Sequence, residues 1–142
     1  MARKYHVGFV RGLINRLVTR SVGRDKGDER VHLLTTVGRK SGEARTTPVT
    51  IVVVDGTRWL VAPYGAVGWV HNLRATAEAK LSRGATTEEI QVTEVFGNEA
   101  APVLAHYLQT VAIVRPYFDV RHDSPMTDIA AEADRHPVFR IA

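Results

Sequence analysis

Three cations lie close together in a glycine-bracketed stretch and could bind an anion. Arg39 and Lys40 follow Gly38, and Arg45 lies three residues beyond Gly42. Glycine permits unusual backbone dihedrals and lets a ligand approach the main chain. Arginine presents a planar fork to carboxylate or phosphate, and lysine presents a point charge. The stretch therefore predicts an anion receptor at a turn between two strands, and the alternative is a solvated turn with ordinary surface cations.

Two common enzyme motifs do not fit this stretch. A phosphate-binding P-loop needs Gly-Lys-Ser/Thr at the start of a helix, but Arg39 separates Gly38 from Lys40 and the following residues predict a strand. The nucleophile elbow of hydrolases has glycine two residues on either side of its serine, and position 39, two residues before Ser41, is arginine. The spacing excludes both classes.

A second candidate stretch combines an aromatic ring and an amide on one side of a short helix predicted over residues 67–76. Trp69, Asn72 and Thr76 share a stripe at helical spacing, and a Pro-Tyr-Gly loop at 63–65 precedes the helix. Together they could line a flat ligand with polar edges. The alternative is that Trp69 belongs to the core and Asn72 caps the local backbone. The predicted core stripe of this helix is Val70, Leu73 and Ala77.

Alternating apolar residues and turn signals predict about six strands in short antiparallel pairs. They cover residues 32–37, 46–54, 58–62, 80–83, 87–96 and 137–141. The dipeptide Asp55-Gly56 is a strong signal for a tight hairpin between the second and third strands. The second strand is apolar on both faces, which predicts burial on both sides. Its two faces are Val49, Ile51 and Val53, and Val52 and Val54.

Helices are predicted at the start, middle and end of the chain. An amphipathic helix covers residues 5–20, and residues 126–134 form the last helix. Asn98 is predicted to cap a helix over residues 99–111, with Pro102 in its first turn. The predicted buried face of this middle helix comprises Val103, Leu104, Tyr107, Leu108 and Val111.

These elements predict the α+β fold class, as a small antiparallel β-barrel with flanking helices. The chain of 142 residues predicts a single domain, 1–142, in which an N-terminal helical segment (1–22) precedes the barrel core (31–142).

The chain has no cysteine, which excludes disulfides and thiolate metal sites. No apolar run approaches the ~20 residues of a membrane span, and no cleavable signal is expected. We therefore expect a cytoplasmic protein.

The formal net charge of +4 suits an anionic ligand, an anionic membrane or nucleic acid without selecting among them. No nucleic-acid partner is expected, because no recognised module is present. The basic N-terminal helix, residues 1–20, could make peripheral contact with the cytoplasmic face of a membrane. The alternative is that its apolar face packs on the domain.

Metal and paired-carboxylate sites are not predicted. The six histidines are dispersed, and the one cluster, His122-Asp123 with Asp128, has weak spacing for a metal and fits solvated loop groups better. Glu88 and Glu89 are adjacent on a strand and so point to opposite faces.

The sequences LLTTVGRKSGEARTTP, VVVDGTRWLVAPYG and GWVHNLRA resemble the deazaflavin-dependent nitroreductase family of split β-barrel proteins, which use coenzyme F420. The resemblance covers residues 5–141 in element order and is dense over 32–76. It implies that the anionic end of the cofactor contacts Gly38, Arg39, Lys40, Ser41, Gly42 and Arg45, with Thr46, Thr47 and Pro48 continuing the groove. It implies that the deazaflavin ring contacts Ala62, Pro63, Tyr64, Gly65, Trp69, Asn72 and Leu73. Many relatives have a Ser or Lys and a Gly pair in place of residues 63–65, so the ring contacts depart from the family pattern.

The same resemblance implies an F420-dependent reductase that passes a hydride to a small-molecule acceptor. Candidate acceptors are a quinone, an enone or unsaturated lactone, and a nitro compound. The candidate substrate-lining residues are Tyr64, Tyr117 and Phe118, of which Tyr64 and Tyr117 are also the catalytic candidates. The possible proton donors are Tyr64, Tyr107, Tyr117, His122 and solvent. The alternatives are a barrel that binds FMN or haem, and a non-catalytic protein that binds lipid or a membrane surface. Both a monomer and a homodimer remain open.

Overall fold

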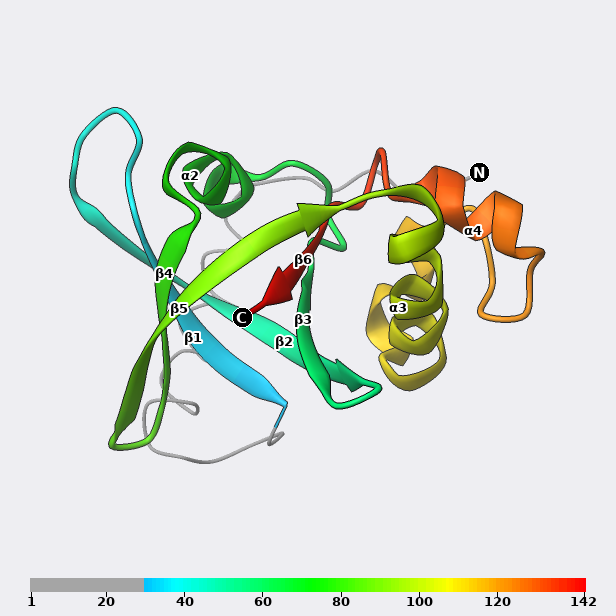
Figure 1. Ribbon diagram of the computed structural model, residues 1–142, viewed down its shortest axis with the longest axis horizontal. Helices are drawn as coiled ribbons and strands as arrows, with labels where there is room; N and C mark the ends of the chain where they lie inside the picture. Colours follow the sequence, from blue (N-terminus) through cyan, green and yellow to red (C-terminus); the bar gives the residue numbers. More distant parts are fainter. Residues whose placement is uncertain (1–29) are drawn as a thin grey trace.

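Six strands form a closed antiparallel barrel in the computed structural model, which describes residues 30–142 (Figure 1). The strands are β1 (Val31–Val37), β2 (Ala44–Val54), β3 (Thr57–Val61), β4 (Glu78–Arg83), β5 (Thr86–Val95) and β6 (Val138–Ile141). Their order around the barrel is β1-β2-β3-β6-β5-β4, and the pairing of β4 with β1 closes it. The predicted antiparallel barrel with flanking helices is confirmed.

The hairpin between β2 and β3 turns at Asp55-Gly56, as the sequence predicts. Both residues have positive φ angles, 53° at Asp55 and 77° at Gly56. These angles are those of the two-residue turn whose twist matches that of paired strands. Val54 pairs with Thr57, so the loop contains two residues.

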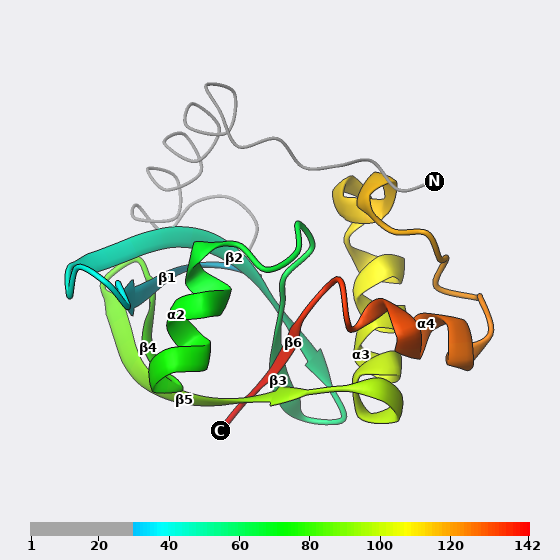
Figure 2. The same cartoon turned by 90° about the horizontal axis from the view of Figure 1, so that it is seen from above.

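The barrel interior holds one hydrophobic core. Every strand contributes to it; representative members are Leu34, Ile51, Leu60, Leu81, Ile90 and Phe139. Helix α2 (Gly68–Thr76) lies beside β1 and β4 (Figure 2). It adds Trp69, Val70 and Leu73 to the same core. The interior core therefore fixes where α2 sits relative to the β1–β2 hairpin.

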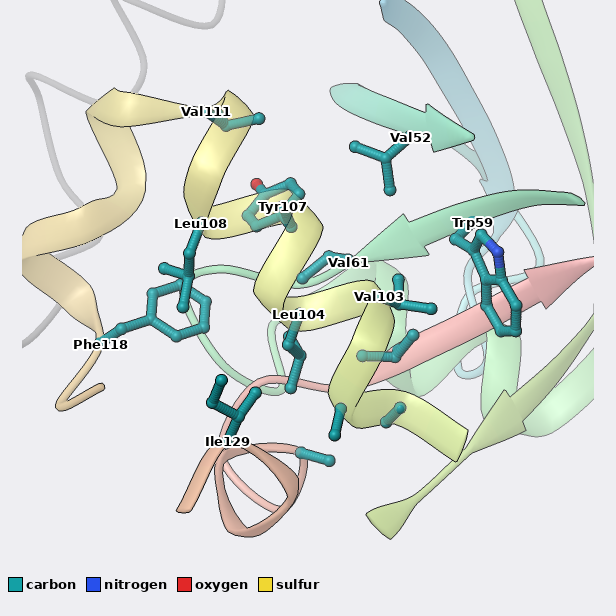
Figure 3. Close-up of a cluster of buried hydrophobic side chains, with 14 of the residues drawn as sticks. Val52, Trp59, Val61, Val103, Leu104, Tyr107, Leu108, Val111, Phe118 and Ile129 are labelled. Atoms are coloured by element: carbon teal, nitrogen blue, oxygen red, sulfur yellow. The ribbon is translucent and has the colours of Figure 1, made fainter. Parts of the chain in front are cut away.

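A second core lies outside the barrel, where α3 (Gly97–Thr110) packs against β2, β3 and β6. The 3₁₀ helix η1 (Ala112–Tyr117) and α4 (Met126–Glu132) complete this layer. Figure 3 shows Val52 and Val61 of the barrel on the side of Leu104 and Tyr107 of α3. Because Ile51 belongs to the interior core and Val52 to the outer one, β2 is buried on both faces, as predicted.

Two predictions for single residues are wrong. Val53 is exposed, because it lies near the hairpin turn, beyond the interior core. Ala77 is not part of the core stripe of α2 but is an exposed C-cap residue with a φ of 58°.

Helix α3 begins two residues before the predicted start. Phe96 is its N-cap and no side chain caps the helix, so the predicted cap at Asn98 is wrong. The reason is that β5 runs to Val95 and the chain enters the helix directly after Phe96. Pro102 consequently lies inside the helix and not in its first turn, which was the position predicted from its missing N–H. The predicted buried face is confirmed for Val103, Leu104, Tyr107, Leu108 and Val111.

The remaining helical predictions have mixed outcomes. Residues 112–117 form a 3₁₀ helix that was not predicted, and α4 ends at Glu132, two residues before the predicted end. The predicted helix over 5–20 lies outside the described residues. No helix in the described part of the chain is long and apolar enough to cross a membrane.

Candidate functional site

The turn between β1 and β2 has a shape that two glycines make possible. The Gly38 N–H donates to the Glu43 carbonyl at 2.7 Å, and the Gly42 N–H donates to the Gly38 carbonyl at 2.8 Å. Gly42 has a φ of 72°, a conformation that side chains disfavour. A Cβ at Gly38 would lie 2.6 Å from the Ser41 Oγ. The Ser41 hydroxyl in turn accepts from the Glu43 N–H at 3.1 Å, so it helps to hold the turn.

Asn72 of α2 fastens this turn to the barrel. Its Oδ1 accepts from the main-chain N–H of Arg39 and from the Arg39 Nη1, both at 3.2 Å. Its Nδ2 donates to the Thr36 Oγ1 at 3.0 Å, and both Asn72 and Thr36 are buried. The alternative that the Asn72 side chain caps the local backbone is wrong, since its partners lie more than thirty residues away. A buried amide satisfied in this way holds its neighbours in one arrangement.

A cavity of about 410 Å³ lies between the turn and α2, within the usual size range of ligand pockets. The β1–β2 side contributes Gly38, Arg39, Lys40, Ser41, Arg45, Thr46 and Thr47. The α2 side contributes Gly68, Trp69 and Asn72. The structure thus brings together the two stretches that the sequence singled out separately. Seven of the predicted cofactor residues are not among the cavity-lining residues: Gly42, Pro48, Ala62, Pro63, Tyr64, Gly65 and Leu73.

The cations of this cavity are available to a ligand. Lys40 has no hydrogen-bond or ion-pair partner among residues 30–142. Arg45 lies 3.4 Å from the Glu43 Oε2, but both side chains are largely exposed, and such pairs contribute about 0–1 kcal/mol. Arg39 is held on one nitrogen by Asn72, and its guanidinium has five N–H donors in all. An incoming phosphate or carboxylate therefore meets three cations without having to break a strong contact.

The other face of the same hairpin lines a larger groove of about 780 Å³. Adjacent residues of a strand point to opposite sides, so Val37 and Ala44 face this groove whereas Arg45 faces the first cavity. The groove contains Glu78 and Glu89 as well as Lys80. Because its charges are mixed, it lacks the convergent cations that an anionic ligand needs, and we assign the candidate site to the smaller cavity.

The loop between β3 and α2 holds the predicted ring-binding residues in different environments. Ala62 and Leu73 are buried in the barrel core, so their side chains pack and do not face a ligand. Gly65 has a φ of 89°, and Tyr64 is partly exposed. The Ala62 N–H donates to the Pro137 carbonyl at 2.8 Å, which fixes the start of the loop on the segment before β6.

The structure joins two of the three candidate substrate-lining residues and separates the third. The rings of Tyr64 and Tyr117 meet edge to face with centroids 4.9 Å apart. Phe118 is only 6% exposed and stacks on His136 at 3.8 Å, so it is a core residue beside Leu108 (Figure 3). Tyr64 and Tyr117 thus form a partly exposed pair, whereas Phe118 belongs to the outer core.

The other proton-donor candidates are less suitable. Tyr107 is buried, and this burial raises the pKa of its hydroxyl well above the ordinary range. His122 lines a separate cavity of about 280 Å³ with Arg115 and Arg121. No group of three or more metal-ligating side chains occurs in the part of the chain that the structure describes.

Three buried polar residues near these features were not identified from the sequence. Thr36 looks like an ordinary strand residue, although its position in β1 places it toward α2. Glu132 and His136 are buried and contact the segment after Tyr117, and their spacing of four residues at the end of a helix was the only signal for a pair.

We compared the chain with known protein families and solved structures. The model of the family described as F420H(2)-dependent quinone reductase matches residues 10–131. A solved F420-H2 dependent reductase (FDR-A) is 24% identical over 82% of this chain and 96% of that chain, with a TM-score of 0.51. A structure described as a domain-swapped dimer is 24% identical over 94% and 96%, with a TM-score of 0.53. A heme binding protein from Mycobacterium smegmatis is 18% identical over 86% of this chain and 48% of that chain, with a TM-score of 0.55. At these identities the solved structures support the fold alone.

Proposed function

The chain belongs to the F420H(2)-dependent quinone reductase family, and we propose that it passes a hydride from reduced coenzyme F420 to a quinone or a similarly electron-poor acceptor. The oxidoreductase activity and the use of F420 follow from the family. The wider set of acceptors, an enone or unsaturated lactone and a nitro compound, and the residues that bind cofactor and acceptor belong to the proposal.

The observation that carries the proposal is the cationic cavity between the β1–β2 turn and α2. Coenzyme F420 has a phosphate and a polyglutamate tail, both anionic. The cavity offers Arg39, Lys40 and Arg45, with hydroxyl donors from Thr46 and Thr47. Charge-assisted hydrogen bonds of this kind are about twice as strong as neutral ones. The donor set therefore fits the anionic end of the cofactor.

The backbone of the cavity also suits a close ligand. A Cβ added at Gly68, the first residue of α2, would meet no atom within 4 Å, so the main chain there is open to the cavity. The N-terminal end of a helix carries unpaired N–H groups and a partial positive charge, which favour an anion. Trp69 follows directly and also lines the cavity. The main chain at Gly68 would thus help to hold the phosphate of the cofactor, and Trp69 would contact its deazaflavin ring.

The reduced deazaflavin, when bound, supplies the hydride, and the protein supplies position and environment. Tyr64, in the loop that leads into α2, and Tyr117, at the end of η1, form a partly exposed pair that offers an aromatic wall for a flat acceptor. Either hydroxyl can donate the proton that must follow the hydride, and Tyr64 is accessible enough for water to serve instead. We assign Tyr64 and Tyr117 to the acceptor and not to the anionic tail.

A fluorescence titration with F420 tests the cofactor assignment. Lys40→Glu and Arg45→Glu should each raise the Kd at least about tenfold, because a lost charge-assisted bond is worth roughly 1.5–3 kcal/mol. Arg121→Glu is the matched control, since it makes the same change of charge on an exposed loop that does not line this cavity. Equal Kd values for all three variants would refute the site.

An acceptor screen tests the reaction. The wild-type protein should oxidise reduced F420 when the soluble naphthoquinone menadione is added, and enones and nitro compounds should be compared with it. A protein that carries FMN or haem as purified and ignores F420 would favour the alternative barrel functions. Liposome flotation that depends on residues 1–20, without F420 binding, would favour a membrane binder.

We also propose a homodimer in solution. The support is that one relative of the same fold is described as a domain-swapped dimer. Light scattering after size-exclusion chromatography decides this, and a mass of about one chain would refute it.

A further inference from the structure

A buried carboxylate contacts the segment that follows Tyr117. The side chain of Glu132, the last residue of α4, is 1% exposed. Buried charges are rare unless they are paired. Its Oε1 accepts from the Asp119 N–H at 2.8 Å, and its Oε2 lies 2.8 Å from the Arg135 Nη2 and 3.6 Å from the His136 Nε2. One carboxylate thus joins the end of α4 to the segment that follows η1.

His136, four residues after Glu132, contacts the same segment after η1. Its ring stacks on that of Phe118 with centroids 3.8 Å apart and an interplanar angle of 22°. Its main-chain N–H donates to the Glu132 carbonyl at 2.8 Å. Phe118 and Asp119 directly follow Tyr117 in the chain. Glu132 and His136 together therefore hold the two residues that come after Tyr117.

The loop that carries Tyr64 rests on the same short segment. The Ala62 N–H donates to the Pro137 carbonyl, and a Cβ at Gly65 would lie 3.5 Å from the Arg135 carbonyl oxygen. Ala62 and Gly65, which flank Tyr64 in this loop, thus lie against residues 135–137. The segment that carries Tyr64 and the segment that follows Tyr117 are far apart in the chain, yet both contact residues 132–137.

We propose that Glu132 and His136 are positioning residues that hold the Tyr64–Tyr117 pair as the aromatic wall of the acceptor site. This inference rests on the proposed function for the identity of the acceptor. The two tyrosines come from different segments, so their edge-to-face geometry requires that both segments keep a fixed distance. Glu132 and His136 lie at the junction where that distance is set.

The test uses the full-length protein and Glu132→Gln, which keeps the volume and the acceptor for the Asp119 N–H but removes the charge. Hydrogen exchange of peptides that contain residues 62–65 and 117–119 should rise about tenfold, while the β1–β2 turn stays protected. The KM for menadione should rise at least about fivefold with kcat changed less than about twofold, and the Kd for F420 should stay unchanged. Glu99→Gln is the matched control, because Glu99 pairs with Arg140 on the surface, at 2.7 Å. It should change none of these quantities.

A folded Glu132→Gln variant with wild-type exchange and wild-type KM would overturn the inference. If that variant does not fold, Arg135→Gln replaces it, since Arg135 is more than half exposed and reaches Glu132 from the solvent side. The same exchange pattern and rise in KM are then expected, and their absence overturns the inference. A wild-type protein that does not bind F420 would refute the proposed function alone, because the exchange measurement needs no cofactor.

Discussion

Asn72 holds Arg39 by both its main chain and its side chain. One amide oxygen accepts from the Arg39 N–H and from the Arg39 Nη1, and the amide nitrogen donates to Thr36. Helix α2, strand β1 and the turn between β1 and β2 are therefore joined at a single buried side chain. The direction of the Arg39 guanidinium is thus set before any ligand arrives, which reduces the ordering that binding requires.

Replacing Asn72 by leucine should weaken cofactor binding and stability together. The change leaves the Arg39 N–H and the Thr36 hydroxyl without partners, and an unsatisfied buried group costs about 1–3 kcal/mol. We expect the Kd for F420 to rise about tenfold and the free energy of unfolding to fall by about 2 kcal/mol. Fluorescence titration and urea unfolding measure the two. Asn98→Ala is the control, because Asn98 is exposed on α3. A Kd that stays at the wild-type value would show that Asn72 does not orient Arg39.

Replacing Gly42 by alanine should strain the turn. The φ of 72° at Gly42 costs a side-chain-bearing residue about 1 kcal/mol, so the free energy of unfolding should fall by about that much. The comparison is Gly68→Ala, where the φ is not positive and a Cβ meets nothing within 4 Å. Because Gly68 begins a helix, its replacement should leave stability unchanged or raise it. Equal stability losses in the two variants would contradict the role of the turn geometry.

Features that depend on nearby residues could be predicted from the sequence. The Asp55-Gly56 hairpin, the alternation along β2 and the glycine-bracketed turn all follow from local conformational preference and periodicity. The start of α3 was missed because a local preference, Asn98 as a cap, competed with the length of β5, which is set by its pairing with β6. Because β5 stays paired with β6 as far as Val95, the helix begins directly afterwards with Phe96 as its N-cap.

Contacts between distant segments could not be predicted. Asn72 reaches Thr36 only because closure of the barrel brings α2 against β1. Phe118 was expected to line the acceptor site because it is an aromatic residue in a loop-like sequence, but it is buried and its ring stacks on His136. The cationic turn was identified because its residues are adjacent in the chain. The support formed by Glu132 and His136 was not, because its partners are spread over more than seventy residues.

The two tyrosines of the proposed acceptor site should act mainly through their rings. Tyr64 is 36% exposed, so water can supply the proton that follows the hydride. Tyr64→Phe should therefore lower kcat less than about tenfold, whereas removal of an indispensable general acid costs about 10²–10⁴. Tyr64→Ala removes the contact with Tyr117 and should raise the KM for menadione about tenfold. Steady-state kinetics with saturating reduced F420 distinguishes these effects. A loss of kcat above 10² in Tyr64→Phe would instead identify its hydroxyl as the proton donor.

His136 should make folding stability depend on pH near neutrality. Burial lowers the pKa of His136, and this effect outweighs the opposing influence of the Glu132 carboxylate and of the Pro63 and Ala62 backbone, while Arg135 lowers the pKa further. Above the unfolded-state pKa of about 6.5, the imidazole is neutral in both states and the stability is fully present. Below it, the unfolded chain takes up a proton more readily, so the free energy of unfolding falls by up to about 1.4 kcal/mol per unit of pKa difference. Urea unfolding at pH 7.5 and 5.5 should therefore show a larger loss in the wild type than in His136→Gln, with His106→Gln as the control. Equal losses in all three proteins would mean that His136 gains its proton as easily in the folded state as in the unfolded chain.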